Sequence, residues 1–416
     1  MTPSPNPRIY FDHAATGWPK PEAVYLAMDR FARECGAASG RGAYASGAVA
    51  DKIVASCRRR LARLVRAVDP NHIAFFCNGT TALNAAILGT VRRGDHVVTT
   101  AIEHNSILRP LESLRQSHGV AIDIVPCDRF GRVGPEAVLQ RVTPQTRLVA
   151  ISHASNVTGT VQDVARLGEA LAPTETLLLC DAAQALGYLP IDMQQGRIDL
   201  LASPGHKGAC GPLGTALLAL SPKALAEIRP TVFGGTGTRS ESPEMPDAMP
   251  ARLEPGNLNV TALAGWDAGL QWLAEHSADA QADGALSDGA LGDGASGSLV
   301  AAAMADFCDQ VGSLGTVRLL GPHSPSYPES PSGQPPLQVV SLAFDRVEVG
   351  LVGSLLDTEF GIEVRTGLHC SPLIHRFIGT APHGTLRISG GHGTTAAHWA
   401  AAAAALREIL GELSGA

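Results

Sequence analysis

A lysine in a short Gly-rich segment is the first residue whose surroundings suit covalent chemistry. Lys207 lies in the sequence Pro204-Gly-His-Lys-Gly208, after an apolar stretch at 200–203, and is one of only four lysines in the chain. Lysines are normally solvated, and Lys20 and Lys223 follow prolines in segments typical of surface turns. A lysine in a tight apolar loop has a lowered pKa, which suits imine formation with a carbonyl compound. We therefore predict a Schiff-base role for Lys207.

A carboxylate directly follows another apolar run. In Leu177-Leu-Leu-Cys-Asp181-Ala-Ala-Gln184, Asp181 comes at the end of a predicted strand, where an unpaired charge is costly to bury. A protonated heterocycle would supply the missing positive charge. A helix N-cap is the alternative, because Asp also caps helices well. These residues alone favour neither interpretation.

A third segment has the pattern of an anion site. Asn78-Gly-Thr-Thr81 follows a predicted strand and opens a predicted helix. Backbone N–H groups and hydroxyls at a helix N-terminus bind anions without needing net positive charge. Asn and Thr are also ordinary capping residues, so a plain N-cap is the stronger interpretation of this segment taken alone.

A cysteine near the C-terminal end of the sequence has a basic setting. Cys370 lies in Arg365-Thr-Gly-Leu-His-Cys-Ser-Pro372, and a neighbouring His and Arg favour the thiolate. A buried, unreactive thiol is an equal alternative. The other seven cysteines lie mostly in apolar or helical runs and indicate structural roles. Arg387 offers a bidentate fork for a carboxylate, although surface pairing fits its local sequence equally well.

The elements that must position these residues alternate along the chain. Helical periodicity at 82–91 and 164–171 separates short apolar runs, a pattern that predicts a mostly parallel sheet covered on both faces. Ligands of such sheets bind at the carboxyl ends of the strands. The seven candidate strands are 72–76, 96–100, 121–125, 147–152, 177–180, 200–203 and 215–220.

The C-terminal third predicts a second, smaller α/β unit. Strand and helix patterns return at 337–344, 349–359, 385–389 and 395–413. The segment 277–298 repeats Asp-Gly-Ala and favours a flexible insert over a calcium-binding repeat. We predict an N-terminal segment (1–16) that joins the small domain, a large domain (17–264) and a small domain (265–416).

Composition restricts the class of protein. The chain has 416 residues, 45% of them hydrophobic, and a net charge of −7, so it has no general attraction for nucleic acid or anionic membranes. The first residues contain no apolar signal-peptide core, and eight scattered cysteines without a C-x-x-C pair indicate reduced thiols. We expect a cytoplasmic protein without a metal site, because no metal-ligand spacing occurs.

Nine short motifs occur in an order that resembles one family. Together they are similar to the class V aminotransferase superfamily, and within it to the cysteine desulfurases. The motifs are Tyr10-Phe-Asp-His-Ala-Ala-Thr16, Trp18-Pro-Lys-Pro21, Gly79-Thr-Thr81, Glu103-His-Asn105, Ser155-Asn-Val-Thr-Gly159, Asp181-Ala-Ala-Gln184, Gly205-His-Lys207, Gly234-Gly-Thr236 and Arg365-Thr-Gly-Leu-His-Cys370.

The resemblance implies a fold type I enzyme that binds pyridoxal 5′-phosphate, normally as a homodimer. It assigns Lys207 to the Schiff base with the cofactor and Asp181 to the pyridine nitrogen, whose protonation helps the ring withdraw electrons. Gln184 would bond the ring hydroxyl, His104 would stack on the ring, and Asn156 would lie beside it.

The same resemblance implies roles for the remaining site residues. Thr80, Thr81 and His206 would hold the phosphate, and Thr236 would reach it from the neighbouring subunit. Arg387 would bind the substrate carboxylate, with Arg365 as a second candidate for this role. Cys370 would accept the sulfur.

The implied activity is removal of sulfur from L-cysteine, which yields L-alanine and a persulfide on Cys370, with another thiol or protein as later acceptor. The alternatives are a selenocysteine lyase, or another pyridoxal-phosphate lyase or aminotransferase that acts on a small amino acid. A nicotinamide-dependent oxidoreductase is disfavoured, because Gly234-Gly-Thr-Gly237 lacks the full G-x-G-x-x-G spacing. A non-catalytic protein that kept the fold is a further alternative.

The sequence departs from the family pattern at four places. His13 replaces an Asn, Tyr44 replaces a His, and Pro204 replaces a Ser or Thr that would offer a hydroxyl to the phosphate. The segment 389–394 lacks the usual aromatic residue and Asn.

Overall fold

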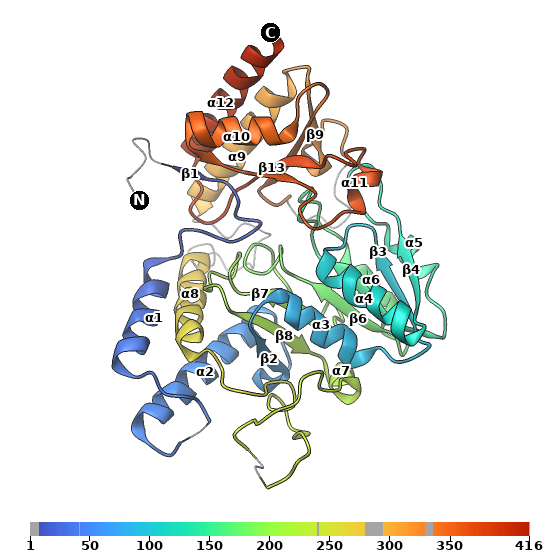
Figure 1. Ribbon diagram of the computed structural model, residues 1–416, viewed down its shortest axis with the longest axis vertical. Coiled ribbons are helices and arrows are strands. Elements are labelled where there is room, and N and C mark those ends of the chain that lie inside the picture. Colours follow the sequence, from blue (N-terminus) through green and yellow to red (C-terminus); the bar gives the residue numbers. More distant parts are fainter. Residues whose placement is uncertain (1–7, 41, 239–240, 279–293, 329–335, 416) are drawn as a thin grey trace.

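The computed structural model describes residues 8–40, 42–238, 241–278, 294–328 and 336–415, and it contains a large and a small domain (Figure 1). The large domain is built on a seven-stranded sheet. Only β8 runs antiparallel to its neighbours, so the predicted mostly parallel sheet is confirmed. In spatial order the strands are β2 (Ile73–Phe76), β8 (Ala216–Leu220), β7 (Leu200–Pro204), β6 (Leu177–Asp181), β5 (Thr146–Ser152), β3 (His96–Thr100) and β4 (Ala121–Val125).

The central strands are apolar along their whole length because both faces of the sheet are covered. Every residue of β6, β7 and β8 is buried. Along β6, Leu178 and Cys180 enter one hydrophobic cluster, whereas Leu177 and Leu179 enter the cluster on the other face. This alternation follows from the two-residue period of a strand, and burial on both sides explains the continuous apolar runs.

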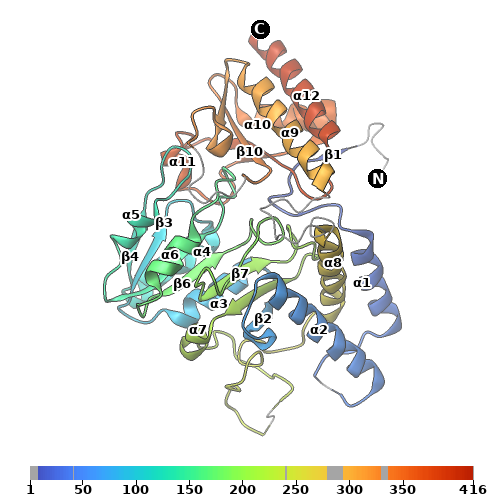
Figure 2. The same cartoon turned by 180° about the vertical axis from the view of Figure 1, so that it is seen from behind.

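Helices cover both faces of the large sheet (Figure 2). One cluster is completed by α3 (Gly79–Thr90), α4 (Asn105–His118) and α7 (Pro222–Glu227). The other is completed by α2 (Ala45–Leu64), α5 (Pro135–Leu139), α6 (Val164–Leu171) and α8 (Val260–Ala278). The turn η1 (Pro70–His72) leads into the first strand of the sheet.

Helix α8 bears on where the large domain ends. It packs against α1 (Glu22–Glu34) and α2, both of which lie with the large domain. A boundary between residues 264 and 265 would cut through α8, so we propose that the large domain extends to the end of this helix. Most of the predicted insert 277–298 lies outside the described residues, and the chain is next described from Gly294.

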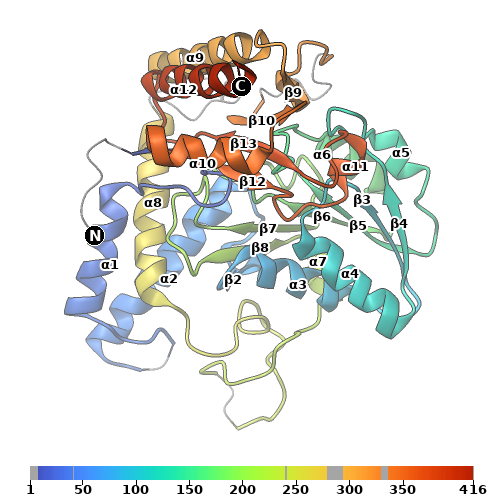
Figure 3. The same cartoon turned by 45° about the horizontal axis from the view of Figure 1, so that its top comes forward.

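The small domain contains an antiparallel sheet of four strands (Figure 3). Phe11, Phe307 and Trp399 are almost completely buried in its core. The N-terminal segment joins this domain, because β1 (Ile9–Tyr10) pairs with β11 (Ile362–Glu363). The sheet order is β12 (Arg365–Gly367), β13 (Thr385–Ser389), β10 (Val339–Phe344) and β9 (Val317–Leu320), and the helical segments are α9 (Gly294–Gly312), η2 (Gly321–His323), α10 (Val349–Phe360), α11 (Ile374–Phe377) and α12 (Ala396–Gly415).

The small domain lies over the carboxyl ends of the parallel strands of the large sheet (Figure 1). The segments that follow β2, β3, β6 and β7 therefore face it, and these are the segments for which the sequence predicts chemistry. Among the described helices, none is both long and apolar enough to cross a membrane.

Candidate active site

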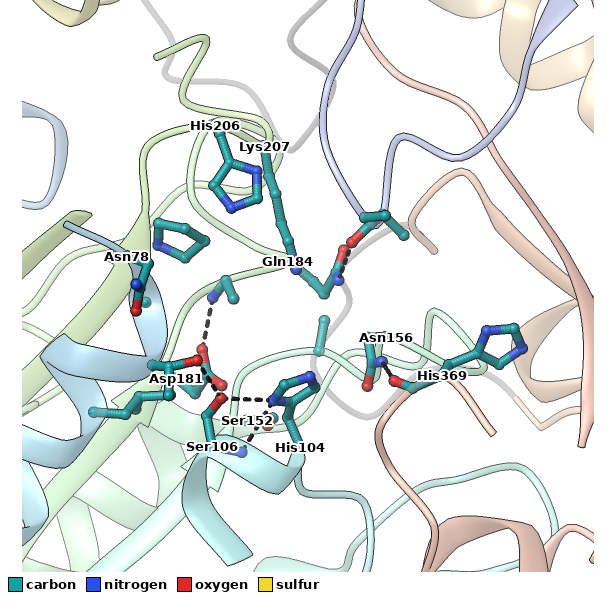
Figure 4. Close-up of a pocket in the computed structure, with 18 of the residues that line it drawn as sticks. Asn78, His104, Ser106, Ser152, Asn156, Asp181, Gln184, His206, Lys207 and His369 are labelled. Atoms are coloured by element: carbon teal, nitrogen blue, oxygen red, sulfur yellow. Dashed lines mark hydrogen bonds between the residues drawn. The ribbon is translucent and has the colours of Figure 1, made fainter. Parts of the chain in front are cut away.

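A cavity of about 230 Å³ opens where the strand ends face the small domain (Figure 4). Three predicted site residues do not line it, namely Thr81, Thr236 and Cys370. The others come together from segments far apart in the sequence. They are Thr80, His104, Asn156, Asp181, Gln184, His206, Lys207, Arg365 and Arg387.

Lys207 reaches this cavity from the turn that follows β7. Glycine is needed in the turn, because a Cβ on Gly205 would lie only 2.3 Å from Thr215 Oγ1. Burial lowers the pKa of Lys207 to about 8, although the nearby Asp181 carboxylate opposes the shift. Part of the amine is therefore uncharged near neutral pH, and the uncharged amine is the form that condenses with an aldehyde.

Lys20 is not the surface lysine that the sequence predicts. It is half-buried, and its Nζ donates a hydrogen bond to the carbonyl of His206. The same carbonyl accepts from the Gly17 N–H at 2.9 Å and from Thr16 Oγ1 at 3.2 Å. Burial lowers the pKa of Lys20 to about 8 as well. Lys20 does not line the cavity, so it supports the turn that carries Lys207.

Asp181 ends β6 and lies in the wall of the cavity (Figure 4). Its Oδ1 accepts a hydrogen bond from the Ala183 N–H at 2.9 Å. A turn follows it instead of a helix, so the N-cap alternative is wrong. Burial raises the pKa of Asp181, because a desolvated carboxylate is unfavourable. A cationic group in the cavity would relieve this cost, as a protonated pyridine nitrogen does.

Gln184 lies one turn beyond Asp181. Its Nε2 donates to the carbonyl of Ala14 at 3.0 Å, which fixes the amide in the cavity wall. Because the amide nitrogen is engaged, its oxygen is the group left to accept from a ligand hydroxyl.

His104 is held with a defined ring orientation. It caps α4, and its Nδ1 accepts from the Ser106 N–H at 3.0 Å. Burial lowers the pKa of His104 to about 4, and the positive charge of Lys207 contributes. The ring is therefore neutral near pH 7 and carries its proton on Nε2. A neutral ring fixed in the wall suits stacking on an aromatic ligand.

Glu103 directly precedes His104, and the sequence gives it no role beyond its place in a motif. Its side chain is completely buried and accepts from Thr100 Oγ1 at 2.5 Å, Ser152 Oγ at 2.7 Å and Ser152 N at 3.1 Å. Burial raises the pKa of Glu103 to about 7, despite these three donors. The carboxyl group ties the segment after β3 to the end of β5.

The start of α3 combines an N-cap with an anion site. The Asn78 side chain accepts from the Thr81 N–H at 2.9 Å, and Thr81 Oγ1 donates back to the Asn78 carbonyl. These bonds occupy Thr81, which explains why it does not line the cavity. The Gly79 and Thr80 N–H groups make no hydrogen bond among the described residues and border the cavity.

A second hydroxyl beside this helix start was missed in the sequence. Ser106 Oγ lies 2.8 Å from Thr80 Oγ1 and also lines the cavity. Ser203 does not replace the hydroxyl lost at Pro204, because its Oγ lies 3.3 Å from the Ala182 carbonyl, to which it donates. Thr80 and Ser106 together offer the hydroxyls of this anion site.

His206 and Arg387 each keep one polar group without a partner among the described residues. The Nδ1 of His206 and the Nε of Arg387 are both buried without a hydrogen bond. Arg387 is only 1% exposed; it bonds Asp12 Oδ1 at 2.6 Å and the Asn156 carbonyl at 2.8 Å. Part of its bidentate fork is therefore already occupied within the protein.

Cys370 does not line the cavity but directly follows His369, which does, and we call this position the rim of the cavity. Its side chain is exposed, and Arg365 Nη2, from a residue that lines the cavity, is 3.7 Å from its Sγ. The neighbouring His369 does not contribute the positive charge expected from the sequence. It is buried, its Nε2 contacts Thr385 Oγ1 at 2.9 Å, and burial lowers its pKa to about 2. Arg365 supplies an adjacent positive charge.

The other cysteines follow the sequence prediction with one correction. Cys77, directly before the start of α3, is exposed and is not part of the core. Cys35 is half-buried, and the other five are buried at positions 57, 127, 180, 210 and 308.

Two of the departures from the family pattern compensate one another. His13 is buried, and a Cβ on Gly391 would lie 2.3 Å from its Nδ1, so only glycine fits beside this ring. Next to it, His392 stacks on Tyr188 with ring centroids 5.0 Å apart and meets Trp272 edge-on. His392 therefore provides the aromatic ring that its segment otherwise lacks. Tyr44 is exposed at the start of α2 and does not line the cavity.

Thr236 lies in the long connection between α7 and α8, which projects from the large domain on the side away from the small domain (Figure 1). Its hydroxyl contacts Thr238 Oγ1 at 3.0 Å.

The residues present fit pyridoxal phosphate. A lysine with a lowered pKa, a desolvated carboxylate, a neutral His ring and a hydroxyl-lined helix start surround one cavity. Each offers what one part of that cofactor requires: an amine for its aldehyde, an anion for its ring nitrogen, a flat surface for its ring and donors for its phosphate. Among the described residues, no group of His, Cys, Asp and Glu is arranged to hold a metal ion.

Comparisons with known proteins agree with this chemistry. The model of the family "Aminotransferase class-V" matches residues 9–288 and 321–398. A probable cysteine desulfurase of Pseudomonas aeruginosa is 31% identical over 393 residues, which cover 92% of this chain and 88% of that protein. One of Methanothermobacter thermautotrophicus is 36% identical over 269 residues, covering 64% of this chain and 66% of that protein.

Solved structures show the same architecture. The apo structure of a cysteine desulfurase from Thermococcus onnurineus superposes with a TM-score of 0.83 at 25% identity, over 97% of this chain and 94% of that one. A cysteine desulfurase from Escherichia coli gives a TM-score of 0.79 at 25% identity, with the same coverage. The chain therefore belongs to the aminotransferase class-V family, has the fold type I architecture, and is similar within that family to cysteine desulfurases.

Proposed function

We propose that this protein is a cysteine desulfurase that uses pyridoxal 5′-phosphate. In the proposed net reaction, L-cysteine and the Cys370 thiol give L-alanine and a Cys370 persulfide. The substrate C–S bond breaks, an S–S bond forms, and the thiol proton is retained by the products, so atoms and electrons balance without an added oxidant. The single observation that carries the proposal is one cavity that joins Lys207 and Asp181 and has Cys370 at its rim.

Each residue has a proposed task towards the cofactor. Lys207 would hold it covalently, Asp181 would face the ring nitrogen, and His104 would cover one face of the ring. When bound, the cofactor supplies electron withdrawal from the substrate α-carbon. Lys207 would be placed to move the substrate α-proton, because its pKa of about 8 allows both protonation states near neutral pH.

The proposed phosphate site is the start of α3. Thr80, Ser106 and His206 line it, and the N–H groups of Gly79 and Thr80, which make no hydrogen bond within the described part of the chain, add to it. Thr81 has its N–H and hydroxyl engaged in the cap, so its proposed role is to support the helix start.

The proposed substrate carboxylate site is formed by Arg387 and Arg365. Both guanidinium groups border the cavity, and Arg387 keeps a buried Nε without a partner among the described residues. A carboxylate placed there would satisfy this donor. Asn156 bonds both Arg387 and the segment of Cys370, and it would lie beside the cofactor ring.

We also propose a homodimer in which Thr236 reaches the phosphate of the neighbouring subunit. On the same connection, Val232 is 62% exposed and Phe233 is 73% exposed. Large apolar side chains at this exposure favour contact with a partner surface. Sedimentation at micromolar protein concentration should give twice the chain mass, and Phe233→Asp should reduce it to a monomer. A monomeric wild-type protein would rule out this arrangement.

The direct test is incubation of the purified protein with L-cysteine and a reductant, with sulfide and alanine measured together. We expect equal amounts of both products in the wild type and neither in Lys207→Ala. Alanine without sulfide, or neither product from protein that carries the cofactor, would contradict the assignment. Release of selenide from selenocysteine that survives in Cys370→Ser would instead indicate the lyase alternative. The sulfur acceptor beyond Cys370 and the cytoplasmic location remain parts of this proposal.

A further inference from the structure

The segment that carries Cys370 is bonded to the large domain at three consecutive residues. The carbonyl of His369 accepts from Asn156 Nδ2 at 2.7 Å, and the carbonyl of Cys370 accepts from the Asn105 N–H at 2.8 Å. The hydroxyl of Ser371 donates to Asn156 Oδ1 at 2.7 Å. One side-chain amide, that of Asn156, thus holds the residues on both sides of Cys370.

The two domains meet in these bonds. Asn105 begins α4, and Asn156 follows β5, so both donors belong to the large domain. The bonded segment follows β12 of the small-domain sheet. Ser371 is completely buried, whereas the Cys370 side chain between these contacts is exposed. The arrangement fixes the backbone and leaves the thiol accessible.

The backbone at this point requires such support. His369 has a φ of +50° and Cys370 a φ of +60°, a region that residues other than glycine rarely occupy. Two consecutive residues in this conformation persist only when their surroundings hold them there. The bonds to Asn105 and Asn156 act on the carbonyls of these same two residues.

The His369 carbonyl orients the Asn156 amide, and Ser371 holds the other end of that amide. The His369 carbonyl can only accept, so Nδ2 must face it, and Oδ1 then faces the Ser371 hydroxyl as acceptor. The main-chain carbonyl of Asn156 also accepts from Arg387 Nη1 at 2.8 Å. Ser371 therefore acts on the residue that joins the proposed carboxylate site to the Cys370 segment.

We propose that Ser371 is a positioning residue for Cys370: its hydroxyl locks the Asn156 amide, which in turn holds the thiol at the rim of the cavity. The consequence for catalysis rests on the proposed function of Cys370 as sulfur acceptor. The positional claim does not, so the two can fail separately.

The test compares alkylation of Cys370 in wild-type, Ser371→Ala and Ser371→Thr proteins, by iodoacetamide and peptide mass spectrometry on the full-length protein. Cys77 is a second exposed thiol and serves as the internal control. We expect Ser371→Ala to raise the Cys370 rate about fivefold, the factor typical of one lost hydrogen bond, with Cys77 unchanged. Ser371→Thr keeps a hydroxyl and should restore the wild-type ratio of the two rates.

A control variant separates positioning from loss of stability. Ser221 lies far from the cavity, where it caps α7 and its hydroxyl donates to Asp199 Oδ1 at 2.7 Å. Ser221→Ala therefore removes a comparable hydroxyl bond elsewhere in the protein. This variant should leave the ratio of the Cys370 and Cys77 alkylation rates unchanged. The proposal would be overturned if this rate ratio were the same in Ser371→Ala as in the wild type. It would also be overturned if Ser221→Ala changed the ratio as much as Ser371→Ala does.

Two further measurements complete the design. In the wild type, the Asn105 amide should exchange slowly with solvent hydrogen, and fast exchange would overturn the proposal even if Ser371→Ala failed to fold.

Sulfide assays should show kcat about fivefold lower in Ser371→Ala with KM for cysteine nearly unchanged, because the acceptor and not the substrate is displaced. If the wild type releases no sulfide, the proposed function fails while the alkylation ratio still tests Ser371.

Discussion

The two sides of the cavity obtain their chemistry in different ways. On the large-domain side, Lys207, Asp181 and His104 lie at strand ends and are largely buried, and burial shifts the pKa of each. On the small-domain side, Cys370 is exposed, and its setting depends on bonds that cross between the domains. Desolvation sets the pKa values of the large-domain residues, whereas hydrogen bonds between the domains set the position of Cys370.

This contrast suits a reaction in two stages. Cofactor chemistry requires a dry, fixed environment in which charges act strongly. A sulfur acceptor must meet both a substrate inside the cavity and another thiol outside it, so an exposed place at the rim is appropriate. Variants on each side should therefore fail in distinguishable ways.

The largest effect is expected from Lys207→Ala. Without the amine, the cofactor has no covalent attachment and the α-proton no base, so sulfide release should fall by about 1,000-fold or more. The visible absorbance of the cofactor-loaded protein should disappear as well. Lys20→Met is the matched control, because it removes the other lysine with a lowered pKa and should leave the absorbance in place.

Cys370→Ser should abolish sulfide release from cysteine while leaving the visible absorbance intact. Cys77→Ser, the change at the other exposed thiol, should have no effect on either measurement. Loss of the absorbance in Cys370→Ser would show that the two sides of the cavity are not separable.

Asp181→Asn removes the buried carboxylate without changing the shape of the side chain. Because the charge that stabilises a protonated ring nitrogen is lost, we expect sulfide release to fall by about 100-fold. Cofactor should still attach at Lys207, as judged by the absorbance of the loaded variant. Activity near that of the wild type would contradict the role given to burial on this side.

Glu103 should make the stability of the cofactor-free protein depend on pH. Its pKa is about 7 in the folded state, above the value of about 4.5 when unfolded, so its stabilising effect is complete below pH 4.5 and is lost as pH rises through 7. The difference corresponds to about 3 kcal/mol. Urea unfolding between pH 4.5 and 8 should show this decline in the wild type and a flatter profile in Glu103→Gln. If the unfolding free energies of the wild type and Glu103→Gln fell in parallel with rising pH, Glu103 would not be the cause of the pH dependence.

The smallest effect is expected beside the small domain. Gly391→Ala places a methyl group against the buried His13 ring, which should lower the free energy of unfolding by about 1–3 kcal/mol. Adding His13→Ala should recover part of this loss, because the two side chains then no longer collide. Purely additive losses in the double variant would show that the two positions do not compete for space.

The same contrast explains what could be predicted from the sequence. Lys207 and Asp181 follow apolar runs that form strands of a parallel sheet. The sequence pattern therefore predicts that both residues lie at the carboxyl edge of this sheet. The exposure of Cys77, the burial of Lys20 and the neutrality of His369 depend on which distant segments pack beside them. No local pattern carries that information.

Hydrogen bonds between residues far apart in the sequence also could not be predicted. Ser371 lies 215 residues from Asn156, and nothing in either segment indicates the bond between them. Ser106 follows the Glu103-His-Asn105 motif closely, yet its hydroxyl matters only because α3 places Thr80 beside it. Long-range geometry, and not residue type, gives these serines their roles.

The central claim is that Lys207 is the amine that binds the cofactor, although Lys20 also has a lowered pKa. Treatment of the protein with pyridoxal phosphate and then borohydride, followed by peptide mass spectrometry, identifies the modified lysine. We predict a single pyridoxyl phosphate group, attached to Lys207. A label on Lys20 or Lys223, or no label on the folded protein, would contradict it.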